Sequence, residues 1–331
     1  MKNLVAGVDI DRVLTSCALV DEFGKIYAKG SFSTQDSKNF RDYVARLKDE
    51  IVDLANSLDT PHTITAVGIG APNSNYYTGE IENAVNLAWK GKLPLAQELS
   101  SIFGNKPVVV TNDANAAAIG EMIYGGAKGM KDFIVITLGT GLGSGIVVGG
   151  NLLYGHDGYA GEAGHITVVK NGRECGCGRK GCLECYASSK GLRNTAIELL
   201  SGTDAPSKLR KIPLEKLNSK DIAVAAKSGD PIAKKCFELT GEILGEALAN
   251  LVAVSSPQAI FLCGGVANAR ELILTPTRRA MEKNILPLWK GKVKLTLSSL
   301  EYENAPILGA AALAIKEIEK RNVVVARRKI F

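Results

Sequence analysis

The chain has 331 residues, of which 46% are hydrophobic and 6% aromatic, and its formal charge is +6 at pH 7. Such a chain is globular and long enough for one large domain or two ordinary domains. Its basic residues are scattered, and no apolar run reaches the roughly 18 residues of a membrane span, so we expect neither nucleic-acid binding nor a membrane anchor.

The N-terminal residues Met1–Val8 lack the apolar core of a secretion signal, so we expect a cytoplasmic protein. In that compartment the seven cysteines should be mostly reduced. A cluster of cysteines then favours a metal site over a disulfide.

The first part of the chain alternates between strand and helix patterns. In chain order, strands are predicted at 4–10, 16–21, 25–32, 64–69 and 108–110, and helices at 39–57, 94–103 and 114–124. The helix that follows Thr111-Asn112-Asp113 has Asp113 in the position of its N-cap.

The second part begins with a strand, a glycine turn and a strand over 133–148, followed by a hairpin-rich section that contains a cysteine cluster. A helical pattern over 188–254, a strand at 259–263 and a final helix over 306–319 complete it. The order of elements resembles that of the first part, which predicts two α/β halves with a ligand-binding cleft between them.

The strongest motif is a set of three thiols and one imidazole: His165, Cys175, Cys177 and Cys182. These side chains make a complete tetrahedral zinc site with no open position, so the metal would have a structural role. A reduced cysteine cluster or a redox pair is the alternative. Cys185 is a possible substitute ligand, although Cys182 better fits the glycine-bounded loop. The other three cysteines, Cys17, Cys236 and Cys263, lie in strand or helix patterns and are expected in the core.

Asp113 stands where a buried strand ends and a helix begins, which is where ligands bind in α/β proteins. An aspartate there can accept the proton of a sugar hydroxyl during phosphoryl transfer. Alone, the position favours an ordinary helix cap, and its pairing with Asn112 and the other motifs reverses that.

The turn Gly139-Thr140-Gly141 lies between two apolar strands, and its amides are suited to phosphate. Gly264-Gly265 ends another strand, where the backbone can approach a nucleotide. Both are also common hairpin or turn sequences. Amides and carboxylates at Asn86, Glu162 and Glu184 suit a polyol, and the two glutamates flank the metal motif.

Together these residues resemble the ROK family of repressors, open-reading-frame proteins and sugar kinases. The matching pieces are Gly79-Glu80-Ile81, Asn86-Leu87-Ala88-Trp89, Thr111 to Ala116, Leu138-Gly139-Thr140-Gly141, Glu162-Ala163-Gly164-His165, Cys175 to Cys182 with Glu184, and Gly264-Gly265. The resemblance implies an actin-like, hexokinase-type (ribonuclease H-like) α/β fold of two domains with a cleft between them. It implies a small domain of 1–113 plus 305–331, and a large domain of 114–304 with the zinc site and a dimer interface.

The resemblance also implies roles for individual residues. Asp113 would be the catalytic base that takes the proton of the 6-hydroxyl of a hexose. The sugar would be held by Asn86, Asn112, Asp113, Glu162, His165 and Glu184. His165 would bind zinc with one ring nitrogen and the sugar with the other. Asp9, Arg12, Gly139, Thr140, Gly141, Gly264 and Gly265 would face ATP, whose phosphates a Mg²⁺ ion would bridge.

One stretch departs from the family pattern. Kinases of the family usually have Asp-x-Gly-Gly-Thr after the first strand, whereas this chain has Asp9-Ile10-Asp11-Arg12-Val13. Asp11 would repel phosphate, and Arg12 would attract it.

The expected function is therefore an ATP-dependent hexose kinase, glucokinase-like by default, in a homodimer or a dimer of dimers. A kinase for an N-acetylhexosamine or fructose and a sugar-binding regulator with weakened kinase activity are the alternatives. A DNA-binding repressor would carry a helix-turn-helix before the first strand, where the sequence begins directly on that strand.

Overall fold

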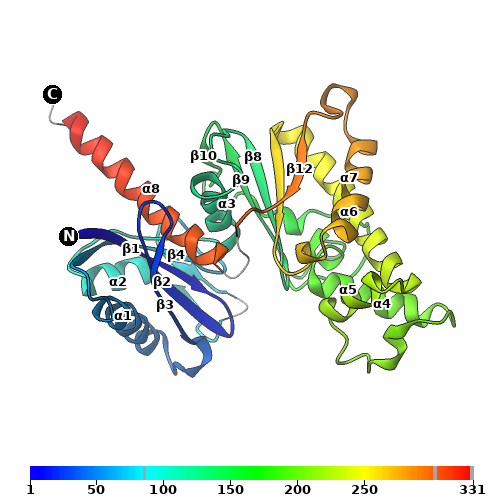
Figure 1. Ribbon diagram of the computed structural model, residues 1–331, viewed down its shortest axis with the longest axis horizontal. Coiled ribbons are helices and arrows are strands. Elements are labelled where there is room, and N and C mark those ends of the chain that lie inside the picture. Colours follow the sequence, from blue (N-terminus) through cyan, green and yellow to red (C-terminus); the bar gives the residue numbers. More distant parts are fainter. Residues whose placement is uncertain (85–86, 301–303, 329–331) are drawn as a thin grey trace. The chain divides into compact units, whose positions relative to one another are not determined.

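In the computed structural model, which describes residues 1–84, 87–300 and 304–328, the chain forms two compact units (Figure 1). The first unit comprises Met1–Gly129, Tyr154–Ala160 and the chain from Ser299 onward. The second comprises Met130–Leu153 and Gly161–Ser298. The second unit is thus an insertion in the sequence of the first.

The first unit is built on a five-stranded sheet in the order β3-β2-β1-β4-β7. The strands are β1 (Lys2–Ile10), β2 (Leu14–Val20), β3 (Ile26–Ser33), β4 (His62–Gly70) and β7 (Val108–Thr111). β1 is antiparallel to β2 and parallel to β4, which is parallel to β7. The carboxyl ends of β1, β4 and β7 therefore meet at one edge, where Asp9 pairs with Gly70 and Gly70 with Thr111.

Two helices, α1 (Phe40–Asn56) and α2 (Leu95–Ile102), pack within this unit, together with the short antiparallel pair β5 (Ile81–Glu82) and β6 (Lys92–Leu93) and the 3-10 turn η1 (Thr34–Asp36). α1 begins where the Asn39 side chain accepts a hydrogen bond from the Asp42 amide. Its buried residues Tyr43, Leu47 and Ile51 recur at helical spacing and join the core on the sheet face of Leu4 and Val8. The predicted strands and helices of this region are confirmed.

The long helix α8 (Ala305–Arg328) packs against β1 and β4 and against α3 (Asp113–Ile123) (Figure 1). Its approach is very close, since a Cβ on Gly68 would lie 1.9 Å from the Ala310 carbonyl oxygen. Because side chains alternate across a strand, Asp9 points to the same face of the sheet as Gly7, which α8 covers.

The first unit therefore extends beyond the expected boundary at residue 113, because α3 packs on α8. It also includes 154–160, a segment that interrupts the second unit. Asn75 holds this segment by donating a hydrogen bond to the Asp157 carbonyl at 2.7 Å.

The second unit has a sheet of the same design, in the order β10-β9-β8-β11-β12. Its strands are β8 (Phe133–Leu138), β9 (Leu142–Val148), β10 (Asn151–Leu152), β11 (Ala259–Cys263) and β12 (Lys294–Leu297). As in the first unit, two antiparallel pairings are followed by two parallel ones. The predicted duplication of topology is confirmed.

The helices of the second unit are α4 (Ser189–Ser201), α5 (Ser219–Lys227), α6 (Pro231–Ser255) and α7 (Glu271–Asn284), with 3-10 turns η2 (Ala163–His165), η3 (Leu183–Cys185), η4 (Lys208–Lys211), η5 (Ala267–Ala269) and η6 (Pro287–Trp289). The stretch predicted as helical over 188–254 is broken between α4 and α5, where Pro206 and Pro213 stand. No described helix is long and apolar enough to cross a membrane.

Candidate functional site

In the first unit, Asp9 and Asp113 lie on either side of Gly70 at the carboxyl edge of the sheet. A Cβ placed on Gly70 would be 3.8 Å from Asp9 Oδ1 and 3.7 Å from Asp113 Cα. Because Gly70 has no side chain, nothing from this residue separates Asp9 of β1 from Asp113, which follows β7.

Burial and the neighbouring carboxylates of Asp113 and Asp11 raise the pKa of Asp9 from 3.8 to about 7. Loss of hydration and the Asp11 carboxylate also raise the pKa of Asp113. Asp113 keeps solvent-exposed surface, so water screens part of this effect. The edge of the sheet therefore concentrates negative charge and favours a cation.

Asp11, Arg12 and Val13 form the exposed connection between β1 and β2, closed by a hydrogen bond from the Asp11 amide to the Leu14 carbonyl at 3.0 Å. The Arg12 amide donates to Asp11 Oδ1 at 2.6 Å. The Asp11 carboxylate therefore occupies the Arg12 amide, which would otherwise be available to a phosphate. Arg12 itself is exposed.

The helix α3 begins one residue earlier than expected. Asn112 is the N-cap, and its side-chain oxygen accepts from the Ala114 amide at 2.9 Å. Asp113 is the first helical residue and accepts from the same amide at 2.8 Å, so the expectation that Asp113 caps the helix was wrong by one residue. Asn86 lies outside the described residues.

In the second unit, the donor atoms of His165, Cys175, Cys177 and Cys182 all lie within 4.8 Å of one another. The Cys177 and Cys182 sulfurs are 3.8 Å apart, and Cys175 Sγ is 3.7 Å from His165 Nδ1. Zinc–sulfur bonds of about 2.3 Å place tetrahedral ligands about 3.8 Å apart. The four predicted ligands therefore fit a zinc ion.

Three of the four predicted metal ligands, Cys175, Cys177 and Cys182, lie in a tight hairpin over residues 173–182, the metal hairpin. Glu174 pairs with Lys180, and the Cys175 amide donates to the Arg179 carbonyl at 2.8 Å. The Arg179 side chain also contacts His165, the fourth predicted ligand, by donating to its backbone carbonyl at 3.1 Å.

The predicted sugar residues Glu162 and Glu184 flank this cluster. His165 follows Glu162 in a 3-10 turn, in which its amide donates to the Glu162 carbonyl at 3.0 Å. Ser144 of β9 positions the turn, since its hydroxyl donates to the Gly161 carbonyl and accepts from the Ala163 amide. Glu184 Oε1 lies 2.9 Å from Cys175 Sγ and 3.8 Å from His165 Nδ1.

The two predicted nucleotide segments also come together, because β8 and β11 are neighbours. Gly264 has a φ of +93°, and a Cβ there would lie 2.7 Å from the Leu138 carbonyl oxygen, directly before the turn Gly139-Thr140-Gly141. Only glycine fits this position. The turn is held from its other side by the Ser189 amide, which donates to the Gly139 carbonyl at 2.8 Å.

Several supporting residues were not predicted, among them Ser144, Ser189 and Arg179. They act through contacts with distant residues or backbone carbonyls, which leave no spacing signal. Two of the predicted core cysteines, Cys17 and Cys236, are buried, whereas Cys263 is partly exposed.

Comparison with known proteins gives one consistent result. A model of the ROK family matches residues 5–317. The glucokinase of Thermotoga maritima is 34% identical over 96% of this chain and 98% of its own length. The crystal structure of a ROK family glucokinase from Streptomyces griseus in complex with glucose and AMPPNP is also 34% identical, with a TM-score of 0.80 over 95% of this chain and 99% of that one. The xylose repressor of Bacillus spizizenii is 30% identical over 81% of this chain and 67% of its own length.

Proposed function

The chain belongs to the ROK family, and on that premise we propose that it transfers the γ-phosphoryl group of ATP to the 6-hydroxyl of a hexose. The match to glucokinases over nearly the full length of both chains is the observation that carries this proposal. Family membership also confirms the predicted actin-like, hexokinase-type fold of two domains.

Asp113 is the catalytic base in this proposal. It accepts the proton of the 6-hydroxyl as the oxygen attacks the γ-phosphorus, and the bond to the β-phosphate oxygen breaks. Its place at the start of α3 supports the role, because the helix fixes the backbone of the carboxylate. A pKa raised above the ordinary value makes the carboxylate a better proton acceptor.

Asp9 would hold the Mg²⁺ ion that accompanies ATP. Buried, unprotonated oxygen donors suit this cation, and a nearby divalent charge would offset the repulsion among Asp9, Asp11 and Asp113. When bound, the ion neutralises charge on the phosphates.

Asn86, Asn112, Glu162, His165 and Glu184 would hold the hexose, since their side chains offer donors and acceptors to its hydroxyls. Cys175 Sγ lies 3.7 Å from His165 Nδ1, so a zinc ion bound through this nitrogen would leave Nε2 for the sugar. Zinc would then set the tautomer and direction of the ring without taking part in the reaction.

The turn Gly139-Thr140-Gly141 would receive the ATP phosphates, and Gly264-Gly265 the adenosine. Their adjacency across β8 and β11 supports one nucleotide contacting both. Arg12 would add a phosphate contact. We further propose a cytoplasmic homodimer or dimer of dimers, with glucose as the default substrate and an N-acetylhexosamine or fructose as alternatives.

A sugar-binding regulator is the second candidate, and Asp11 is the observation that favours it. Its carboxylate occupies the Arg12 amide and adds negative charge where a phosphate-binding glycine is expected. Such a protein would bind hexose while transferring phosphate slowly.

The two candidates are distinguished by incubating the chain with ATP, Mg²⁺ and a panel of hexoses while following ADP release. ADP release that requires one sugar, with a 6-phosphate product and a large loss in Asp113→Asn, supports the kinase. The exposed Asp59, remote from the carboxylate cluster in sequence, gives the matched control Asp59→Asn. If no sugar is phosphorylated but sugars still raise the melting temperature, the kinase proposal is wrong and the regulator stands.

A further inference from the structure

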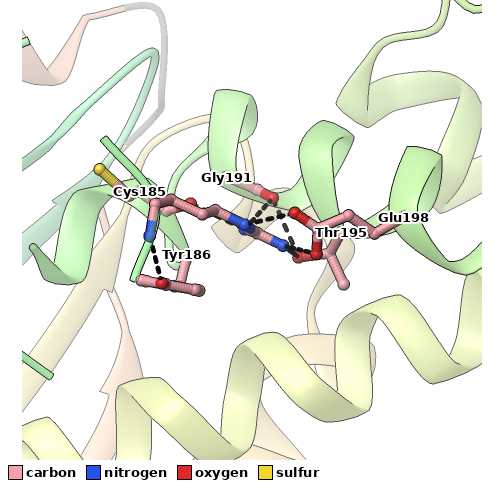
Figure 2. Close-up of polar contacts among 6 residues, drawn as sticks. Cys185, Tyr186, Gly191, Thr195 and Glu198 are labelled. Carbon is pink, nitrogen blue, oxygen red and sulfur yellow. Dashed lines mark hydrogen bonds and ion pairs between the residues drawn. The ribbon is translucent and has the colours of Figure 1, made fainter. Parts of the chain in front are cut away.

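The Arg173 side chain, at the base of the metal hairpin, is largely buried, with 16% of its surface exposed. It reaches α4, where it contacts Gly191, Thr195 and Glu198. Figure 2 shows the residues around it. Cys185 is the last residue of η3, Tyr186 follows it, and Gly191, Thr195 and Glu198 lie on α4.

All five N–H groups that a guanidinium offers have acceptors here. Nε and Nη2 donate to the two carboxylate oxygens of Glu198, at 2.8 and 2.6 Å. Nη1 donates to the carbonyls of Cys185 and Gly191 at 2.8 and 3.1 Å, and Nη2 also donates to Thr195 Oγ1 at 2.9 Å. The guanidinium carbon lies 4.6 Å from the centre of the Tyr186 ring. Lysine cannot reproduce this planar, forked arrangement.

The backbone of Arg173 belongs to the same arrangement. Its amide donates to the Tyr186 hydroxyl at 2.8 Å, and its carbonyl accepts from the Gly181 amide at 2.8 Å. The residue therefore joins both strands of the metal hairpin to the segment that follows the last cysteine ligand.

Glu184 lies within that segment, one residue before Cys185. Its backbone carbonyl accepts from the Ser188 hydroxyl at 2.6 Å, and Ser188 caps α4. The Glu184 carboxylate has only one described hydrogen-bond contact, to Cys175, which is itself a proposed metal ligand. Its position therefore depends on how the hairpin is fixed relative to α4.

We infer that Arg173 is a positioning residue that locks the metal hairpin onto α4 and so aligns Glu184 with the metal ligands for hexose binding. The inference rests on the proposed hexose and metal sites. The ATP turn is held by its own strand ladder, by Gly264 and by the Ser189 amide at the start of α4. Arg173 makes none of these contacts, so its loss should act on sugar and metal affinity more than on ATP affinity.

Three variants test this. Arg173→Met keeps the bulk of the side chain and removes all five donors, and Arg173→Lys keeps the charge without the fork. The matched control is Arg193→Met, because Arg193 lies on α4 and donates to the carbonyls of Leu217 and Leu214, which are not part of the metal hairpin.

The measurements are the rate of zinc release to a chromogenic chelator and the KM values for hexose and ATP. We expect Arg173→Met to release zinc about 10- to 100-fold faster and to raise the hexose KM by a similar factor, as for other residues that orient metal ligands. The KM for ATP should change by no more than about twofold. Arg173→Lys should show most of the same loss, and Arg193→Met should resemble the wild type.

Wild-type zinc release and hexose KM in folded Arg173→Met, or full function in Arg173→Lys, would overturn the inference. Equal losses in Arg193→Met would overturn it too, because they would show a general weakening of α4. If the wild type holds no metal, the proposed metal site fails and the hexose KM alone decides about Arg173. If no hexose is phosphorylated, the proposed reaction fails and zinc release decides.

Discussion

Replacing Asp9 by asparagine should make the first unit more stable at alkaline pH while removing its response to Mg²⁺. The carboxylate of Asp9 is held near Asp11 and Asp113 in a partly buried position, and its pKa is about 7 instead of 3.8. The folded state therefore holds the proton more tightly than the unfolded state. Stability is highest when Asp9 is protonated and is lost as pH rises from the unfolded pKa through the folded one.

A displacement of the pKa from 3.8 to about 7 corresponds to an upper limit of about 4 kcal/mol, at about 1.4 kcal/mol per pH unit. Relaxation around the charge reduces this, so we expect Asp9→Asn to gain about 2–4 kcal/mol at about pH 8. The gain should shrink by more than half near pH 5, where the wild-type carboxyl is neutral in the folded chain.

The assay is denaturant unfolding followed by tryptophan fluorescence. The chain has two tryptophans, Trp89 buried in the first unit and Trp289 in the second. A Trp289→Phe background therefore makes Trp89 a reporter of the first unit, which matters because two-domain chains need not unfold in one step. Asp59→Asn is the control for loss of an exposed carboxylate.

Added Mg²⁺ should stabilise the wild type at about pH 8 and leave Asp9→Asn unchanged, because only the wild type gains a ligand-bound folded state. An Asp9→Asn chain that is no more stable than the wild type at alkaline pH would refute the reasoning. A gain that stays constant with pH would refute the electrostatic cause, even if stability rose.

Three further outcomes are expected. Asp113→Asn should lower kcat by about 10²–10⁴-fold, while hexose still raises the melting temperature; a loss below about tenfold would contradict its role as the base. Gly264→Ala should lower the unfolding free energy by about 2–3 kcal/mol and raise the KM for ATP, because φ is +93° and the new Cβ would meet backbone at 2.7 Å. Gly149→Ala, at φ +58° with open space around it, separates the cost of the backbone angle from that of the clash in the same denaturation curves. Cys182→Ser should lose the metal in elemental analysis while Cys236→Ser, also buried, keeps it; equal metal content in both would count against the site.

The elements that bring the site residues together could be predicted because their patterns are local. A short continuous apolar run identifies β1, and the spacing of Tyr43, Leu47 and Ile51 identifies α1. The metal cluster was equally predictable, because its ligands span few residues and include uncommon side chains.

Features that depend on distant partners could not be predicted. Helix α7 contains Pro276, which ordinarily argues against a helix, yet Pro276 packs closely on Gly241 of α6. The unit boundary after α3 likewise depends on α8, since a Cβ on Gly309 would lie 2.4 Å from the Ala116 carbonyl oxygen. Neither pairing leaves a periodic signal in either segment.

The packing of α8 on β1 and β4 has a consequence for synthesis of the protein. The first strands leave the ribosome early, but the helix that covers one face of their sheet is translated only after the whole second unit. The nascent chain therefore carries an uncovered apolar sheet face while residues 130–298 are being made, whereas the second unit has all of its own residues by Ser298. Vectorial folding should complete the inserted unit first, and a stop codon before α8 should leave a first unit that needs chaperones even though both sheets are encoded in full.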